Sequence, residues 1–287
     1  MKRIIFIGFA IVLLALGFAY VKREPLLLGY FASKTPTVAL AEHEDFLRTH
    51  IQYRPPATGA GPYPAVALFH GCVGVRQAFM DQWADAVNEA GYMAVIIDSL
   101  GPRGVGFDEA WETVCKGQRL IGQERAGDVQ AALNIIKARP DIDGDKIVLA
   151  GWSHGAWTLM DFLTMDMKRA RPTQLRTQKL VRHEPEGVIL FYPYCGQGAR
   201  SRFAGWAGDA PAITFIAGSD RIVNADECLS VFKALERRGE SIDLHYYPDA
   251  DHVFDNAALE GEDAQYYIEE YANDATEKVK AFLATRK

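Results

Sequence analysis

The sequence predicts an α/β protein in which helices cover both faces of a mostly parallel central sheet. Short apolar runs of strand length alternate with amphipathic stretches of helix length over most of the chain, and this alternation is typical of parallel sheets. Several of the short runs are apolar throughout and rich in β-branched residues. Strands that are covered on both faces need such residues, because neither face meets water.

The predicted elements follow one another in regular order along the chain. Strands are expected at residues 46–53, 65–69, 93–97, 146–150, 187–191, 213–217 and 242–247. Helices are expected at residues 75–90, 123–138, 154–167, 225–238 and 262–285. In the helix at 123–138 apolar residues recur on one face, and Pro140 ends the pattern. The segment from residue 25 to about residue 42 has no clear periodicity and is expected to lead into the domain.

Length and charge set the broad class of the protein. The 287 residues suit one large domain or two small ones, and the composition is close to that of globular proteins. The formal net charge is -6, and lysines and arginines are scattered along the chain. Because no dense basic patch is visible, we predict no nucleic-acid partner.

The N-terminus differs from the rest of the chain. Two basic residues precede an unbroken apolar run at residues 4–21, and two more follow it. A basic start before an apolar stretch is typical of an export signal, and this run is just long enough to span a hydrocarbon core of about 30 Å. We predict that residues 1–24 are either a signal peptide, cleaved after Ala19, or an uncleaved anchor that binds the membrane. In both cases residues 25–287 form a domain outside the cytoplasm.

The strongest local motif follows the strand predicted at 146–150. It reads Gly151-Trp152-Ser153-His154-Gly155 and leads directly into a predicted helix. This is the G-x-S-x-G nucleophile elbow, in which a tight strand-to-helix turn exposes a reactive serine. The alternative is an ordinary turn in which Ser153 only caps the helix.

Two later loops supply the partners that a serine nucleophile needs. A serine hydroxyl requires a base to take its proton, and an acid must orient that base. Asp220 follows the strand predicted at 213–217, and His252 follows the strand at 242–247. The order Ser153, Asp220, His252 is the one that this fold requires.

Other residues compete for these two roles. Asp249 and Asp251 are alternatives for the acid, but they are so near His252 in sequence that we expect them to shape its turn. His154 and His245 are alternatives for the base. We expect the side chain of His154 to point away from Ser153 and His245 to be a packed or surface residue of a strand.

Acyl transfer also needs hydrogen-bond donors for the negative charge that develops on the substrate oxygen. We expect one donor to be the backbone N–H of His154, which follows the nucleophile. The second should come from the loop after the strand at 65–69. We choose the N–H of Cys72 there, with Gly71 and Val73 as alternatives.

With these residues in place, the chain resembles the dienelactone hydrolase family over roughly residues 45–285. The resemblance rests on the elbow and on four further motifs: Leu68-Phe69-His70-Gly71, Asp98-Ser99, Gly218-Ser219-Asp220, and Tyr247-Pro248 leading to His252-Val253-Phe254. It implies an α/β-hydrolase fold without a large cap domain. It also implies activity on small esters or lactones.

The chain departs from the family at two points. The best-known members use a cysteine nucleophile, whereas this chain has Ser153. They also bind a substrate carboxylate with two arginines. Arg103 roughly matches the first of these and is the candidate substrate-binding residue, with a surface or structural charge as the alternative. Asp255-Asn256 occupies the region where the second is expected.

The four cysteines fit an oxidising compartment, since their number is even and the N-terminus predicts export. Cys72 and Cys115 would both lie near loops at the strand ends, and Cys195 and Cys228 both follow later strands. We predict disulfides between the members of each pair. The alternative is four buried free thiols.

These residues predict a serine hydrolase that acts in two steps through an acyl-enzyme on Ser153. A small carboxylic ester or lactone is the expected substrate, with an exported peptidase or an acyltransferase as alternatives that would use the same three residues. A binding module without catalysis is a further alternative. Histidines and cysteines show no H-x-x-x-H or C-x-x-C spacing, and no dinucleotide motif follows the first strands. We therefore predict neither a metal nor a cofactor.

Overall fold

The protein folds around one seven-stranded sheet, as seen in a computed structural model whose residues 25–286 are described here. The strand order is β1-β3-β2-β4-β5-β6-β7, and β1 is antiparallel to β3 while the other neighbours are parallel. The strands are β1 (Ile51–Arg54), β2 (Tyr63–Phe69), β3 (Met93–Ile97), β4 (Ile142–Trp152), β5 (Gly187–Phe191), β6 (Ala212–Ala217) and β7 (Ile242–Tyr247). This confirms the predicted α/β-hydrolase fold.

Seven α-helices are described between residues 37 and 286, most of them connecting one strand to the next. They are α2 (Leu40–Arg48), α3 (Gln77–Glu89), α4 (Phe107–Thr113), α5 (Gly122–Lys137), α6 (His154–Leu163), α7 (Ala225–Glu236) and α8 (Glu269–Ala284). Short 3₁₀-helices lie at Gly101–Arg103, Thr173–Leu175, Arg200–Arg202 and Gly261–Tyr266.

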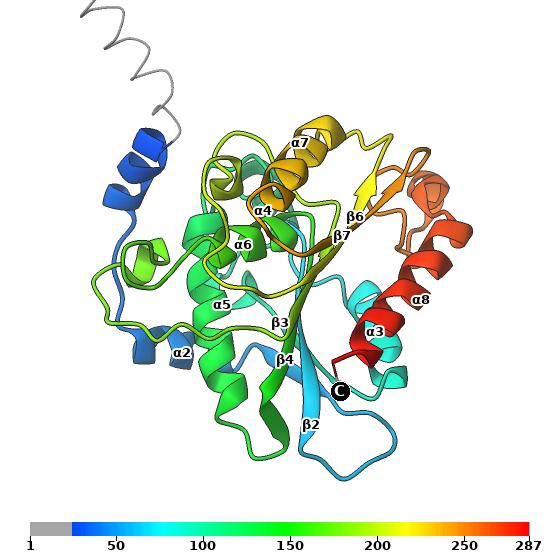
Figure 1. Cartoon of the computed structure of the whole chain (residues 1–287), viewed down its shortest axis with the longest axis horizontal. Coiled ribbons are helices and arrows are strands. Elements are labelled where there is room, and N and C mark those ends of the chain that lie inside the picture. Colours follow the sequence, from blue (N-terminus) through cyan, green and yellow to red (C-terminus); the bar gives the residue numbers. More distant parts are fainter. Residues whose placement is uncertain (1–24, 287) are drawn as a thin grey trace, which may run out of the picture. The chain divides into compact units, whose positions relative to one another are not determined.

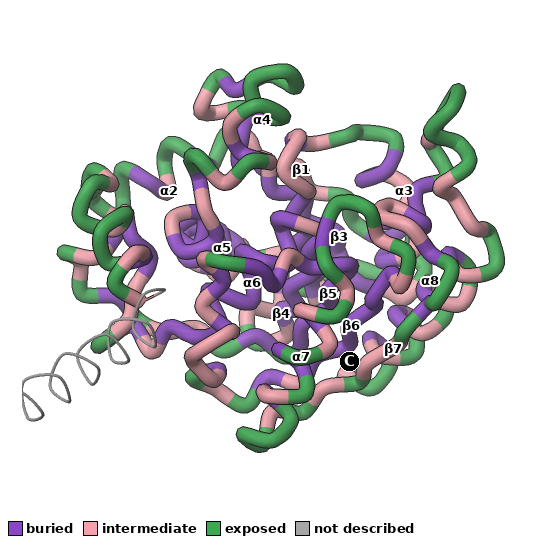
Figure 2. The backbone as a smooth tube through the Cα atoms, turned by 90° about the horizontal axis from the view of Figure 1, so that it is seen from above, coloured by how far each residue is buried: buried purple, intermediate pink, exposed green. Residues whose placement is uncertain are grey.

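The helices form two layers, one on each face of the sheet (Figure 1). Side chains of α5, α6 and α7 pack on one face in a single apolar cluster, and side chains of α3 and α8 pack on the other. The inner strands of the sheet are mostly buried, whereas the edge strands β1 and β7 and the outer sides of the helices are partly or fully exposed (Figure 2). Burial on both faces explains why strands such as β3 are apolar at every position.

The chain divides into two compact units, residues 1–36 and residues 37–287. In the first unit residues 25–34 are helical. The predicted signal peptide or anchor, residues 1–24, lies outside the described residues. From residue 25 to residue 286, no helix combines the length and the hydrophobicity that crossing a bilayer requires.

Two predicted elements need correction. The strand expected at residues 46–53 was wrong in its first part, because Leu40–Arg48 is the helix α2 and β1 begins at Ile51. His43 fixes this helix by a hydrogen bond of 2.8 Å to Asp128 on α5, a partner distant in sequence. The helix expected at 262–285 is interrupted, since a 3₁₀-helix precedes α8.

Strand order places the candidate site. From β2 the chain passes to β3 on one side, and from β3 it returns to β4 on the other side of β2. In such sheets ligands bind at the carboxyl ends of the strands where the winding direction changes. Here that position is the edge formed by the ends of β2 and β4, where Phe69 pairs with Gly151.

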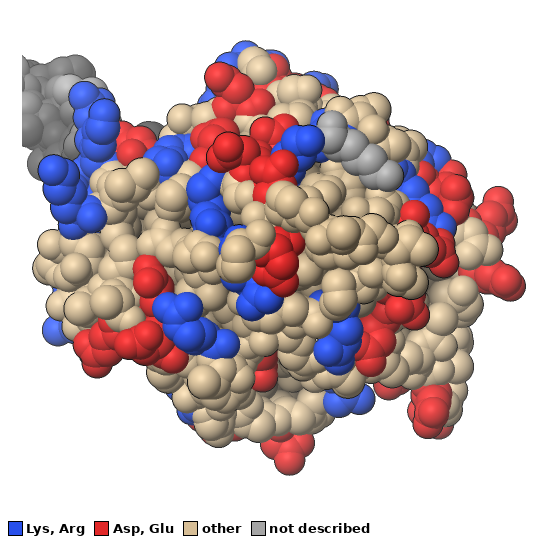
Figure 3. Space-filling model, turned by 90° about the horizontal axis from the view of Figure 1, so that it is seen from below, with Lys and Arg blue, Asp and Glu red and all other residues tan. Residues whose placement is uncertain are grey.

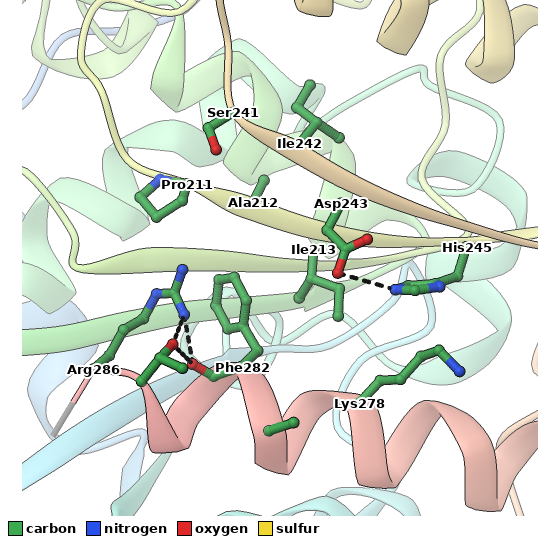
Figure 4. Close-up of a pocket in the computed structure, with 12 residues that line it drawn as sticks. Pro211, Ala212, Ile213, Ser241, Ile242, Asp243, His245, Lys278, Phe282 and Arg286 are labelled. Atoms are coloured by element: carbon green, nitrogen blue, oxygen red, sulfur yellow. Dashed lines mark hydrogen bonds and ion pairs between the residues drawn. The ribbon is translucent and has the colours of Figure 1, made fainter.

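The surface carries both signs of charge. On the face shown in Figure 3, basic and acidic side chains are interspersed among uncharged ones. An open pocket of about 600 Å³ lies between α8 and the first residues of β6 and β7. Its charged side chains pair with other groups of the protein. Asp243 and His245, for example, are 3.2 Å apart, and Arg286 donates to the carbonyl oxygen of Phe282 (Figure 4).

Candidate active site

Ser153 lies at the tip of a tight turn between β4 and α6. Its backbone has φ 54° and ψ −115°, a strained conformation for a residue with a side chain. The flanking glycines make the turn possible. A Cβ atom on Gly151 would lie 2.7 Å from the backbone nitrogen of Ala156, and one on Gly155 would lie 2.1 Å from the carbonyl oxygen of Phe69. The G-x-S-x-G pattern is therefore a steric requirement of this turn.

The structure brings Ser153, His252 and Asp220 together. The Nε2 atom of His252 is 2.9 Å from Oγ of Ser153, and its Nδ1 atom is 2.7 Å from Oδ2 of Asp220. The imidazole thus bridges a hydroxyl and a carboxylate. The carboxylate is fully buried, while the side chain of His252 is 11% exposed. In this arrangement His252 can accept the hydroxyl proton, and Asp220 can stabilise the imidazolium that results.

The loops that carry Asp220 and His252 are tied to each other. The second oxygen of Asp220 accepts hydrogen bonds from the backbone N–H groups of Ile222 and Val223. Asp251 accepts hydrogen bonds from the backbone N–H groups of Arg221 and His252 and pairs with the Arg221 guanidinium. Asp251 therefore shapes the turn beside His252, as expected from the sequence.

Neither alternative histidine reaches Ser153 through its side chain. His154 is buried, and its Nδ1 atom is 3.1 Å from the guanidinium of Arg125. Burial, with the Arg125 charge second, lowers the pKa of His154 well below its usual value. His245 stacks on Phe215 in the neighbouring strand.

The loop after β2 passes beside the elbow. A Cβ atom on Gly71 would lie 3.7 Å from Cβ of Ser153, so the backbone of this loop borders the hydroxyl. The buried ring of His70 fixes the loop, because its Nε2 atom accepts the N–H of Ser99 and its Nδ1 atom lies 2.6 Å from the carbonyl oxygen of Gly71. Within residues 25–286 the backbone N–H groups of Cys72 and His154 have no protein acceptor.

Arg125 is a feature of the site that the sequence did not indicate. Its guanidinium is buried on α5 and donates to the carbonyl oxygen of His70, to Oγ of Ser99 and to Nδ1 of His154. Burial lowers the pKa of Arg125 to about 10, so it stays protonated at neutral pH. One cation thus contacts the backbone of His70, in the loop that carries Cys72, and the side chain of His154.

Arg103, expected to bind substrate, lies in a different setting. Its guanidinium forms two hydrogen bonds to the buried carboxylate of Asp128, of 2.8 and 3.0 Å, and one to the carbonyl oxygen of Ser99. Burial opposes ionisation of Asp128, but the charge of Arg103 and the hydrogen bonds from His43 and Arg103 together outweigh it and hold the pKa of that carboxyl below its usual range. Substrate binding by Arg103 stays a prediction, and the structure shows a cation that is already paired.

Asp255 also differs from the expectation for the region after His252. It is fully buried, and its oxygens accept hydrogen bonds from Trp83, Trp152 and Tyr192. It therefore lies behind the histidine loop. A lone aspartate in a loop is ordinarily exposed, so nothing in the local sequence indicated this burial.

Both predicted disulfides are confirmed. Cys72 is bonded to Cys115, and Cys195 is bonded to Cys228. The first bond joins the loop beside Ser153 to the residues after α4. The second joins the loop after β5 to α7.

The fold and the Ser–His–Asp arrangement together define the class of α/β-hydrolase proteins. Comparison with known families narrows the class, since the profile of the dienelactone hydrolase family matches residues 51–172 and 175–286. The chain therefore belongs to the dienelactone hydrolase family.

Solved structures show the same fold at low sequence identity. An esterase from Thermogutta terrifontis, solved with butyrate bound, aligns with a TM-score of 0.61 at 16% identity, covering 82% of this chain and 88% of that one. A dienelactone hydrolase-like promiscuous phosphotriesterase from metagenomic libraries aligns with a TM-score of 0.57 at 15% identity, covering 82% and 92%.

Curated relatives of this chain are named after a peptidase activity. A protein of Fusarium vanettenii named dipeptidyl-aminopeptidase B is 28% identical over 230 residues, or 71% of this chain. A protein of the same name from Grosmannia clavigera is 28% identical over 56% of this chain. The chain spans only 24% and 17% of the lengths of these two relatives.

Proposed function

We propose that the protein is a serine hydrolase that cleaves small carboxylic esters or lactones through an acyl-enzyme on Ser153. The observation that carries this proposal is the continuous hydrogen-bonded chain from Ser153 through His252 to Asp220, with distances of 2.9 and 2.7 Å. A positioned base and a buried carboxylate are what a serine needs to become a nucleophile.

The reaction follows from this geometry in two steps. Oγ of Ser153 attacks the carbonyl carbon while Nε2 of His252 takes its proton, and Asp220 stabilises the imidazolium. The alcohol leaves with that proton. Water then attacks the acyl-enzyme with the same assistance from His252, which releases the acid and restores Ser153.

The backbone N–H groups of His154 and Cys72 are the proposed donors to the oxygen that becomes negative. His154 begins α6, so its N–H points out of the helix N-terminus, where negative charge is favoured. Cys72 follows Gly71, which lies beside Ser153, since a Cβ atom on Gly71 would be 3.7 Å from Cβ of Ser153. Loss of one such donor typically lowers kcat by about 10²–10³-fold.

Ester hydrolysis is tested with p-nitrophenyl esters of increasing acyl length and with Ser153→Ala as the matched variant. We expect preference for short acyl chains and a loss of at least about 10³-fold in kcat in the variant. A fluorophosphonate should label Ser153 in the folded protein. Absence of both labelling and turnover would contradict the proposal and favour a binding role.

Peptide hydrolysis is a second candidate, because the curated relatives are named dipeptidyl-aminopeptidase B. The same three residues can cleave amides, so the site alone does not separate the two activities. Parallel assays with p-nitrophenyl esters and dipeptide p-nitroanilides separate them. Faster turnover of the anilides, abolished in Ser153→Ala, would replace the esterase proposal by a peptidase.

We further propose that the hydrolase domain lies outside the cytoplasm. The two disulfides support this, since such bonds are rare in reducing compartments, and so does the basic and apolar N-terminal sequence. A fusion of residues 1–40 to a reporter enzyme that is active only after export would test it. An inactive fusion would contradict it.

A further inference from the structure

Asp255 is a buried carboxylate with an uncommon set of partners. Its side chain is fully buried, and it accepts three hydrogen bonds from neutral side chains. Oδ2 is 3.0 Å from Nε1 of Trp83 and 3.0 Å from Nε1 of Trp152, and Oδ1 is 2.7 Å from the hydroxyl of Tyr192. Among the described residues no lysine or arginine forms an ion pair with it.

These partners lead directly to the two reacting side chains. Trp152 is the residue before Ser153 in the elbow, and Asp255 itself follows His252 by three positions. Tyr192 lies directly after β5, and its ring centroid is 4.6 Å from that of His252. The contacts therefore close a ring that runs from Ser153 to Trp152, Asp255, Tyr192 and His252 and back to Ser153.

The backbone of this ring is strained at three points. Ser153, Tyr192 and Val253 all have positive φ angles, of 54°, 34° and 60°. For a β-branched residue such as Val253 this conformation is costly, and it persists only where surrounding contacts fix it. Asp255 lies two residues after Val253 and binds the hydroxyl of Tyr192, so it contributes to holding both.

Packing alone does not require a carboxylate here. Burial raises the pKa of Asp255 to about 6, and an apolar side chain would avoid the cost of burying an ionisable group. What an apolar residue lacks is directional bonds to three different elements. Trp83 comes from α3, Trp152 from β4 and Tyr192 from the position directly after β5.

We propose that Asp255 is a positioning residue that fixes the distance between Ser153 and His252 through its bonds to Trp152 and Tyr192. The inference rests on the proposed function, because it concerns the alignment of the same nucleophile and base. Asp255 itself does not touch substrate in this role. Its effect is transmitted by the indole that precedes Ser153 and by the phenol that packs on His252.

The chain offers a matched pair of variants for the test. Tyr192→Phe removes the hydroxyl that donates to Asp255 and keeps the aromatic side chain that packs on His252. Tyr247→Phe removes a comparable bond, since the buried Tyr247 donates to Asp274 of α8 at 2.5 Å. Both variants lose one hydrogen bond between a phenol and a carboxylate. Only in Tyr192→Phe does that hydrogen bond belong to the closed set of contacts that joins Ser153 and His252.

The expected result is a difference in kcat at similar stability. Tyr192→Phe should lower kcat for a short p-nitrophenyl ester by about tenfold or more, because small misplacements of reacting groups are costly, with KM changed less than about twofold. Tyr247→Phe should keep kcat within about twofold. Both should lower the thermal midpoint by a similar few degrees.

Asp255→Asn is the second variant. The amide oxygen can still accept from both indoles, while the amide nitrogen faces the hydroxyl of Tyr192, so the bond to Tyr192 changes and the core stays filled. We expect a larger loss in kcat than for Tyr192→Phe. Equal kcat in wild type, Tyr192→Phe and Asp255→Asn would overturn the inference, as would an equal loss in Tyr247→Phe.

The failure of this inference is distinguishable from failure of the proposed function. If wild type labels at Ser153 with a fluorophosphonate and the ring variants label equally fast, only the positioning role fails. If wild type neither labels nor turns over esters, the proposed function fails. In that case the positioning role is tested by NMR of the proton on Nδ1 of His252. Its resonance should shift in Tyr192→Phe and remain in place in Tyr247→Phe.

Discussion

The loop that carries Ser153 and the two loops that carry Asp220 and His252 reach their positions by different means. The elbow is fixed by close contact of main-chain atoms, with Gly155 against the carbonyl oxygen of Phe69. The other two loops also meet closely, since a Cβ atom on Gly218 would lie 2.7 Å from main-chain atoms of Pro248. They depend in addition on polar contacts, among them the ion pair of Arg221 with Asp251. Arg221 is 62% exposed, whereas the residues around the elbow are buried.

This difference sets how each part should respond to change. Atoms in close contact have no room to move, so a single added methyl group at the elbow must displace the backbone. Exposed polar contacts are partly replaced by water when one partner is removed. The exposed positions of the acid and base loops, such as Arg221, should therefore tolerate substitution.

The largest effect is expected for Asp220→Asn. The amide would keep its bonds to the N–H groups of Ile222 and Val223 through its oxygen, and would present its nitrogen to Nδ1 of His252. That reverses the tautomer of His252, so its Nε2 atom could no longer accept the proton of Ser153. We expect kcat for an ester to fall by about 10³–10⁴-fold with little change in KM.

Asp251→Asn is the matched control, since Asp251 is adjacent to His252 in sequence but its carboxylate pairs with Arg221. Its kcat should stay within about fivefold of wild type, because the amide oxygen can still accept the backbone N–H bonds. Equal losses in the two variants would mean that Asp220 acts only as part of the loop.

Gly155→Ala should have the next largest effect. Its Cβ atom would lie 2.1 Å from the carbonyl oxygen of Phe69 and 2.7 Å from that of His70, so either β2 or α6 must move. We expect the free energy of unfolding to fall by about 3 kcal/mol or more, with loss of most activity. Urea unfolding measures the first and ester turnover the second.

Gly106→Ala is the control for that substitution. No atom lies within 4 Å of a Cβ at Gly106, and its φ of −80° suits any residue. Its stability should stay within about 0.5 kcal/mol of wild type. A Gly155→Ala protein as stable as Gly106→Ala would show that the elbow is looser than the contacts indicate.

The same difference explains what could be predicted from the sequence. The elbow, the parallel strands and the positions of Asp220 and His252 follow from local patterns, because each is marked by a strand, a glycine turn or a fixed order. Asp255 and Arg125 could not be recognised, since their meaning depends on donors and acceptors that lie far away in the chain. Trp83 and Asp255, for example, are 172 residues apart.

The error in the first predicted strand has a related origin. The apolar residues at 46–53 suggested a strand, but Leu47 and His43 face α5, and the bond of His43 to Asp128 favours a helix there. The substrate-binding role predicted for Arg103 is a separate matter and stays a prediction, but the same Asp128 pairs with its guanidinium. Both contacts of Asp128 join residues far apart in the chain, and a single sequence does not show which charges meet.

The two disulfides allow the comparison between regions to be sharpened. They enclose loops of similar length, with separations of 43 and 33 residues, so each should stabilise the protein by a similar amount of about 2–4 kcal/mol. Only Cys72 lies in the loop beside Ser153. Replacing Cys72 and Cys115 by serine should therefore lower kcat by about tenfold, whereas replacing Cys195 and Cys228 should lower the thermal midpoint similarly and leave kcat nearly unchanged. Equal effects on kcat would argue against a role for the Cys72 loop in stabilising the oxyanion.

The smallest effect is expected for Arg221→Ala. The substitution removes the guanidinium that pairs with Asp251, but the backbone N–H of residue 221 still donates to the same carboxylate, at 3.0 Å in the present structure. Because the lost charge is exposed and screened by salt, kcat should fall by less than about threefold, and the difference from wild type should shrink further at high ionic strength. If Arg221→Ala were instead as damaging as Asp220→Asn, the ion pair itself would be positioning His252. Exposed polar contacts would then be as sensitive to substitution as the close packing at the elbow.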